Sequence, residues 1–366
     1  MSLRFCIIAL FSAMAFVGCQ NDSTNNSDSN KPKARGTLGE IILVIDSAKY
    51  AGPVGDALKE IFESDIEGII REESMFYMRK VDPRKMTRML RMASNIIFVT
   101  TFDDKRPGSR TVANQFSPES IEKSRADSSL FMLRNKNEFA VGQEVIYLFG
   151  ENEEELITNV KANKDLLQSI FSNKEKEILS KALFNRINGE GVSKVAEKFE
   201  VAVKLPASYQ LAKEGEDFLW FRQPTIGVDK PDISLFFYQT TYEDESQVFP
   251  ENIIKLRNEI TKPNIFGDPD VPESFVIIEK QIPPAFKNIR IDGQYSVEMR
   301  GSWKTNNLTM GGSFLSYTVV DEAKGKIFYM DGFVYYPNEA HRASIREIET
   351  ILQATKFELE SESTSK

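Results

Sequence analysis

The stretch from Glu298 to Pro337 reads E-M-R-G-S-W-K-T-N-N-L-T-M-G-G-S-F-L-S-Y-T-V-V-D-E-A-K-G-K-I-F-Y-M-D-G-F-V-Y-Y-P. Phe, Tyr, Val, Ile and Thr dominate it, which is the composition of strands. The pattern predicts a strand ending at Trp303, a second over 313–321 and a third over 326–336. The Gly in D-E-A-K-G-K suits the tight turn between the last two. Because this is the densest aromatic run in the chain, we expect it to form the centre of a sheet.

The rest of the C-terminal half has strand-like runs and helices that suit such a sheet. The strand-like runs are 199–205, 218–222, 233–242, 274–282 and 295–303, and the helices are 251–261 and 339–354. Runs of strands closed by a helix predict an α+β domain, here a mainly antiparallel sheet packed by helices. The order of elements is similar to that of PsbP and Mog1-like domains, an analogy of architecture that carries no function.

Strands and helices alternate in the N-terminal half, which predicts a second domain of α/β type. The expected strands are 39–46, 75–81, 95–101, 130–133 and 144–149, and the expected early helices are 53–62, 83–92 and 117–126. Two more helices follow, the second beginning at a Ser172–Glu175 capping box and stopping near Gly189. We place the domain boundary at N-G-E-G, 188–191. The domains are then 38–190 and 191–358, with a disordered acidic tail over 359–366.

The first residues carry a targeting signal. Arg4 precedes an apolar run over 5–17 that is too short to span a bilayer comfortably, and the run ends F-V-G-C at Cys19. This ending resembles the lipobox of bacterial lipoproteins. The resemblance implies a signal peptide over 1–18, a diacylglycerol thioether on Cys19 and an acyl chain, such as palmitate, on its new amine. A plain signal peptide with an incidental Cys is the alternative. Residues 19–37 are expected to form a flexible tether.

The lipobox predicts where the protein is located and what becomes of its two cysteines. The membrane is the expected partner through the N-terminal lipid. Gln20, rather than Asp, follows Cys19, which by the sorting habit of enteric lipoproteins favours the outer membrane, facing the periplasm. The chain has two cysteines; Cys6 leaves with the signal and Cys19 carries the lipid. The mature protein therefore has no thiol for a disulfide, a nucleophile or a metal site. The net charge of -8 argues against nucleic acid as a partner.

Few residues point to catalysis. His341 is the single histidine, at the start of the last predicted helix, and is expected to be a packing or helix-end group. The alternative is a lone general base. Acidic clusters at 103–104, 151–155 and 268–270 suit solvated loops and helix starts, although a glycosidase-like carboxyl pair stays open. Phosphate loops and dinucleotide fingerprints are missing from the sequence, so we predict no cofactor and no metal site, and the catalytic residues stay unknown.

Two stretches are candidates for binding. On the predicted helix 83–92, Arg84, Arg88 and Arg91 share one face and methionines the other, which suits anionic headgroups or an acidic protein partner. The alternative is an ordinary helix with Met in the core. The other candidate is Arg300, Trp303 and Met310, where an aromatic ring beside an Arg would face a ligand. The alternative there is a core Trp303 and a close approach of backbones at the Gly-Gly pair.

The lipobox together with R-G-S-W, M-G-G-S-F-L-S-Y and D-G-F-V-Y-Y-P resembles the Bacteroidetes lipoprotein family catalogued as domain of unknown function 4837. The likeness extends over nearly all of the mature chain. It implies a lipoprotein of the cell envelope and supplies no activity. We therefore expect a lipid-anchored, non-enzymatic binding or accessory module with an envelope protein as a possible partner. A carboxylate hydrolase with a cleft between the domains, or a carrier of a small apolar or glycan ligand, is the alternative.

Overall fold

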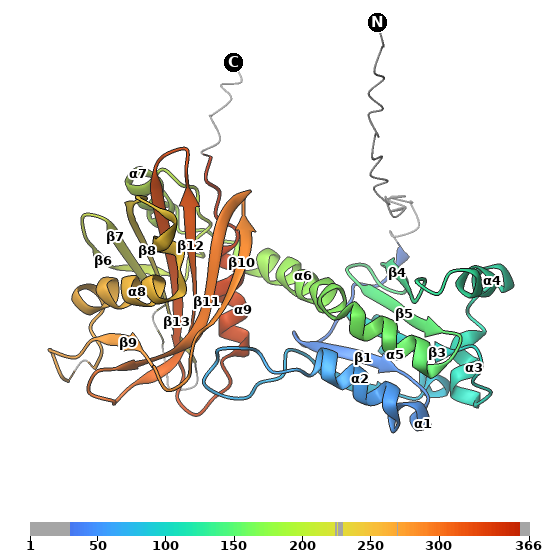
Figure 1. Cartoon of the computed structure of the whole chain (residues 1–366). Helices are drawn as coiled ribbons and strands as arrows, with labels where there is room; N and C mark the ends of the chain where they lie inside the picture. Colours follow the sequence, from blue (N-terminus) through green and yellow to red (C-terminus); the bar gives the residue numbers. More distant parts are fainter. Residues whose placement is uncertain (1–29, 224, 226–229, 269, 359–366) are drawn as a thin grey trace, which may run out of the picture.

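A computed structural model describes residues 30–358 except 224, 226–229 and 269. Two sheets with their helices lie side by side, and the long helix α6 (Lys164–Leu183) reaches from one towards the other (Figure 1). This architecture is α+β, as the sequence predicts. The signal peptide, Cys19 and the 359–366 tail lie outside the described residues. Among the described residues, no helix combines the length and the apolar character needed to cross a bilayer.

The N-terminal sheet has the order β2-β1-β3-β5-β4. Its strands are β1 (Glu40–Val44), β2 (Tyr77–Val81), β3 (Asn95–Thr101), β4 (Met132–Lys136) and β5 (Glu144–Gly150). The strands β2, β1, β3 and β5 are parallel, and β4 is an antiparallel edge strand. Every residue of β3 and β5 is buried, because helices cover both faces of a parallel sheet.

The helices divide between the two faces. One face is covered by α2 (Pro53–Phe62), α5 (Glu153–Ala162) and α6, and the other by α3 (Pro107–Ala113) and α4 (Pro118–Ala126). The four-residue α1 (Ser47–Tyr50) precedes α2. The chain thus leaves β1 towards one face and leaves the neighbouring β3 towards the other. Adjacent strands with this arrangement form a topological switch point, where loops diverge outside the carboxyl ends of the strands.

Two helix predictions in this half are wrong. Residues 83–92 form only two 3₁₀ turns, η2 (Pro83–Lys85) and η3 (Leu90–Met92), with extended backbone at Met86 between them. A helix of this length is marginal by itself, and Met86 and Leu90 instead pack on the sheet. Ser172 caps no helix, because α6 begins at Lys164 and runs through it.

The C-terminal sheet has eight strands, seven of them in the order β10-β11-β12-β13-β8-β7-β6, with β9 pairing β11. The strands are β6 (Gln210–Glu214), β7 (Phe218–Gln223), β8 (Asp232–Thr241), β9 (Val276–Ile278), β10 (Ala285–Ile291), β11 (Gln294–Thr305), β12 (Gly311–Asp321) and β13 (Lys326–Tyr335). All pairs are antiparallel. The quoted stretch supplies β12 and β13 at the centre, as predicted, and Gly325 has a φ of 60° in the turn between them.

Helices pack on both faces of this sheet. On one face α7 (Gly189–Phe199) and α9 (Arg342–Leu352) cover a core that includes Tyr317 and Met330. On the other, α8 (Pro250–Asn264) and the 3₁₀ turn η4 (Glu245–Val248) adjoin a core that includes Trp303 and Phe333. The edge strands β6 and β10 escaped prediction, and residues 199–205 form no strand. N-G-E-G is the start of α7, where the Asn188 side chain accepts a hydrogen bond from the Gly191 N–H, 2.9 Å away.

Two segments make contacts that the sequence patterns do not predict. The end of the predicted 19–37 tether is docked: Ala34 N–H donates to Val141 O and Arg35 N–H to Met92 O, each over 2.8 Å. The loop 63–76 leaves the N-terminal sheet and lies against the C-terminal one, where Ile69 joins the core (Figure 1). A Cβ at Gly68, whose φ is 77°, would lie 2.5 Å from Arg300 O. The two halves of the chain are therefore packed together closely.

Candidate functional site

A groove lies between the two halves of the molecule. A cavity of about 510 Å³ is bounded by the 64–67 loop, α6, α9, the start of β10 and β11. A second cavity of about 330 Å³ continues along β10 to Asp292. Both are lined by Lys176, Lys287, Glu298, Arg300 and Glu349. These shared residues make the two cavities one space, which we call the interdomain groove.

The floor of the groove carries paired charges. Arg300 Nε donates to Glu298 Oε1 over 2.6 Å, and its Nη2 lies 3.5 Å from Glu349 Oε2. The Tyr317 hydroxyl donates to Glu298 Oε2 over 3.0 Å. Burial tends to raise the pKa of Glu349, but Arg300 and Lys176 outweigh it and hold the pKa below its usual value. A carboxyl that acts as a general acid needs a raised pKa, so Glu349 does not suit that role.

The wall of the groove is the edge strand β10. It pairs with β11 on one side, and its other edge pairs with no strand among the described residues. Ala285, Lys287 and Ile289 line the space, with aliphatic and basic side chains alternating along the strand. An unpaired edge presents backbone N–H and C=O groups to any extended chain laid beside it.

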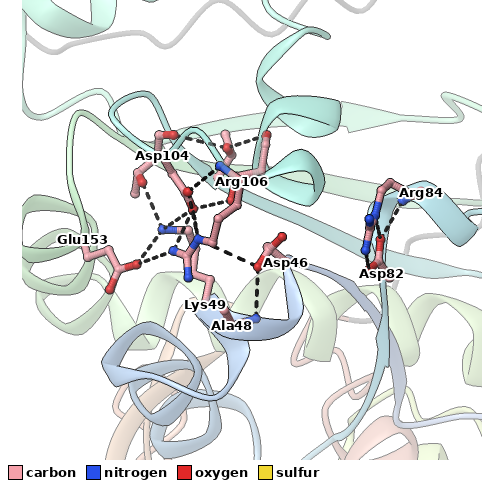
Figure 2. A network of polar contacts seen from close by, with 11 residues as sticks. Asp46, Ala48, Lys49, Asp82, Arg84, Asp104, Arg106 and Glu153 are labelled. Atoms are coloured by element: carbon pink, nitrogen blue, oxygen red, sulfur yellow. Dashed lines mark hydrogen bonds and ion pairs between the residues drawn. The ribbon is translucent and has the colours of Figure 1, made fainter.

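A second polar site lies at the switch point of the N-terminal sheet (Figure 2). Lys49 Nζ lies 3.0 Å from Thr101 Oγ1, 2.8 Å from Glu153 Oε1 and 3.3 Å from Asp104 Oδ2. Arg106 forms a two-pronged pair with Asp104, over 2.8 Å at both nitrogens. Thr101 ends β3, and the other residues follow β1, β3 or β5. They meet because the carboxyl ends of parallel strands lie at one edge of the sheet.

The charged groups of the switch-point network form hydrogen bonds and ion pairs with one another. Asp104 also accepts a 2.5 Å hydrogen bond from Ser109, and burial of the carboxyl is outweighed by these donors and by Lys49, so its pKa lies well below the usual value. Asp46, at the end of β1, caps the following turn through Ala48 N–H over 3.0 Å. Lys49 is fully buried with three oxygen partners, an arrangement that fastens three loops together. The interdomain groove is therefore the better candidate for a ligand.

The predicted Arg84, Arg88 and Arg91 surface is divided by the fold. Arg84 follows β2 at the carboxyl edge of the sheet and pairs with Asp82 over 2.7 Å, near the switch-point network (Figure 2). Arg91 precedes β3 at the opposite, amino edge and lies over the Phe139 ring, 5.1 Å from its centroid. The segment crosses the whole sheet between them without forming a helix. Arg88 and Arg91 are close to each other, and Arg84 is far from both.

The Arg300, Trp303 and Met310 set is divided as well. Side chains three residues apart on a strand point to opposite faces. Arg300 accordingly faces the groove, whereas Trp303 is buried in the other core and donates through Nε1 to Val334 O over 3.1 Å. Met310 is partly buried against that same core. His341, at the N-cap position of α9, is buried and lies 2.9 Å from Ser313 Oγ through Nδ1.

Sequence reasoning missed most of the groove. Glu298, Glu349 and Lys176 lie on three elements far apart in the chain, and no local motif links them. Lys49 was missed for the same reason, although the acidic clusters that supply its partners were visible. Among the described residues, no group of three or more His, Cys, Asp or Glu side chains is placed to hold a metal ion.

Two family models match consecutive parts of the chain. Residues 189–354 match the family described as Domain of unknown function (DUF4837). The likeness proposed from the sequence is thereby confirmed for the C-terminal half. Residues 34–184 match a different model, Domain of unknown function (DUF8532), so the likeness does not extend over the whole mature chain. A search of curated proteins finds no match.

Several solved structures resemble part of the chain. LpqN of Mycobacterium tuberculosis, described as involved in cell envelope biogenesis, is 14% identical, with a TM-score of 0.26, over 43% of this chain and 82% of its own. A Bacteroides thetaiotaomicron protein is 9% identical over 44% of this chain and 46% of its own, with a TM-score of 0.24. A point mutant of the protein Mog1 is 8% identical over 43% of this chain and 90% of its own, with a TM-score of 0.28.

Proposed function

We propose that this protein is a lipid-anchored, non-enzymatic binding module of the cell envelope, and that the interdomain groove holds an extended segment of a partner polypeptide. The observation that carries the binding role is the unpaired edge of β10 along a continuous groove. Strand addition to such an edge supplies main-chain hydrogen bonds, and pockets beside it select alternate side chains of the partner.

The charges of the groove favour a polypeptide with both acidic and apolar residues. Lys287 and Arg290 lie on the strand itself, while Ile289 packs against the adjoining core. Arg300, Lys176 and Arg346 already have carboxylate partners. Lys164 on α6 and the basic residues of β10 are the lining cations that remain to recognise acidic side chains. The lipid on Cys19 would hold this groove close to its partner in the envelope, facing the periplasm at the outer membrane.

Photocrosslinking in intact cells tests the binding role. A photoreactive residue replaces Lys287 in the groove, and the control places it at Lys255 on α8, which packs on the opposite face of the sheet. We expect a discrete adduct with one envelope polypeptide from position 287 and none from position 255. Equal labelling at both positions, or no adduct at 287, contradicts the proposal.

The anchor is tested separately. Cys19→Ser removes the sulfur that the lipid modifies, so we expect the variant to leave the membrane fraction in high salt while the unaltered protein stays in it. If the variant remains with the membranes quantitatively, the lipid anchor is wrong.

A further inference from the structure

We propose that the protein has a second membrane contact, a basic face that rests on anionic lipid headgroups at the amino edge of the N-terminal sheet. Six cations form it, and we call it the amino-edge basic face: Lys31, Lys33, Arg35, Arg88, Arg91 and Lys136. This inference rests on the proposed lipid anchor, which would bring the face to a bilayer.

Three segments bring these cations together. Arg35 pairs with Ala93 in a parallel bridge, and Lys33 does so with Val141. Gln143 Nε2 donates to Arg91 O over 2.7 Å and to Ala93 O over 2.6 Å. The segments 31–35, 88–93 and 136–143 therefore lie side by side where β1, β3 and β5 begin.

The charge of this face is unusual for the molecule. The chain has a net charge of -8, and many of its surface cations have carboxylate partners. Lys33, Arg35, Arg88, Arg91 and Lys136 are exposed and form no ion pair with another described residue. The three segments contain one acid, Glu138, whose carboxylate accepts hydrogen bonds from Tyr147 and Asn135. These five cations thus lie on a surface with little negative charge to balance them.

The position of the anchor favours a lipid surface as the occupant. Ten residues, 20–29, separate Cys19 from Asn30, where the described chain begins beside the basic face. Even fully extended, this length spans roughly 35 Å, and a coil of it spans about 20 Å. A lipid on Cys19 would therefore keep this edge of the sheet within that distance of the membrane.

An apolar side chain stands among the cations. Met89 is 77% exposed, more than any other large apolar side chain among the described residues. Its neighbours Arg88 and Arg91 bracket it. Basic residues around an exposed apolar one suit the headgroup region, where cations meet phosphate and the apolar group enters the acyl boundary.

Vesicle binding by unlipidated protein tests the face without the anchor. The protein used is the chain from Gln20 to Lys366, which keeps every described residue. It is mixed with vesicles of phosphatidylcholine alone or with vesicles in which about one lipid in three is phosphatidylglycerol. We expect binding to the anionic vesicles only, and its loss in high salt. A cation near such a surface contributes roughly fivefold to partitioning, so Arg88→Gln with Arg91→Gln should weaken binding about 25-fold.

The matched control removes the same charge from the other half of the molecule. Lys255→Gln with Lys280→Gln should leave vesicle binding unchanged. Lys33→Gln with Arg35→Gln provides a second test pair if the first lowers the midpoint of unfolding. Equal binding to neutral and anionic vesicles, or equal loss in the control, overturns the proposal, and so does retention of binding in both test pairs. None of these outcomes bears on Cys19, whose own variant tests the anchor.

Discussion

The carboxylate of Glu73 caps helix α9 from the other half of the molecule: its Oε1 lies 2.7 Å from the backbone nitrogen of His341. Its Oε2 accepts the next N–H, that of Arg342, over 2.8 Å. The first N–H groups of a helix have no partner within the helix, and a carboxylate there also complements the helix dipole. A residue of the 63–76 loop thus completes a helix that forms one wall of the groove.

We expect Glu73→Ala to lower the free energy of unfolding by about 1–2 kcal/mol, the usual value of a lost N-cap. The loss should be visible in the midpoint of urea denaturation. Glu72→Ala removes an exposed carboxylate one residue earlier and should change the midpoint little. If both variants behave alike, the contact with His341 has no special role in stability.

The switch-point network predicts acid sensitivity. The pKa of Asp104 lies below its ordinary value of 3.8, so the folded state binds this proton less readily than the unfolded state. Its stabilisation is therefore present above about pH 4 and is lost as the pH falls below that value. We expect Asp104→Asn to be less stable than the natural protein at pH 7 and to lose less stability between pH 4 and pH 2. Parallel curves of unfolding free energy against pH would contradict this.

A buried ion pair lies in the C-terminal core. Arg257 Nε donates to Asp331 Oδ2 over 2.8 Å, both side chains are fully buried, and the guanidinium lies over the Phe314 ring. Asp331→Ala leaves a buried charge without its partner, which costs about 3–5 kcal/mol. Arg257→Met combined with Asp331→Leu should recover most of that loss in thermal or denaturant unfolding. An Asp331→Ala variant as stable as the natural chain would refute this assignment.

Gly312 allows Trp303 to pack against the centre of the sheet. A Cβ at Gly312 would collide with Val334 O and lie 2.9 Å from Trp303 Nε1. Because the carbonyl belongs to a central strand and cannot move away easily, we expect Gly312→Ala to lower the free energy of unfolding by about 3 kcal/mol. This is the upper end of the usual cost of overpacking a core. Gly189→Ala is the control, since a Cβ there meets no atom within 4 Å. Urea denaturation followed by tryptophan fluorescence would separate the two variants.

Helices were predicted correctly where the residues of the helix itself carried the pattern that defines it. Pro53–Phe62 was predicted with the bounds observed, because a proline at the first turn and an apolar stripe are both local. Pro118–Ala126 was predicted to within one residue from the Ser117 cap and the proline after it. Residues 83–92 carried a helical pattern too, but packing on the sheet left only two 3₁₀ turns there. The edge strand β10 was missed because its exposed, charged residues hide the alternation that marks a strand.

The sequence by itself determined the central strands of the aromatic C-terminal sheet and the alternation of strands and helices before it, since apolar periodicity and turn residues act over a few neighbours. It also supplied every charge of the groove and of the amino-edge basic face. Only the tertiary structure decided which charges meet. Arg84 and Arg91 are seven residues apart in the chain yet lie at opposite edges of one sheet, while Glu73 and His341 are in contact. Such pairs depend on how strands order and domains dock, which is set by burial of the whole apolar surface and not by any local run of residues.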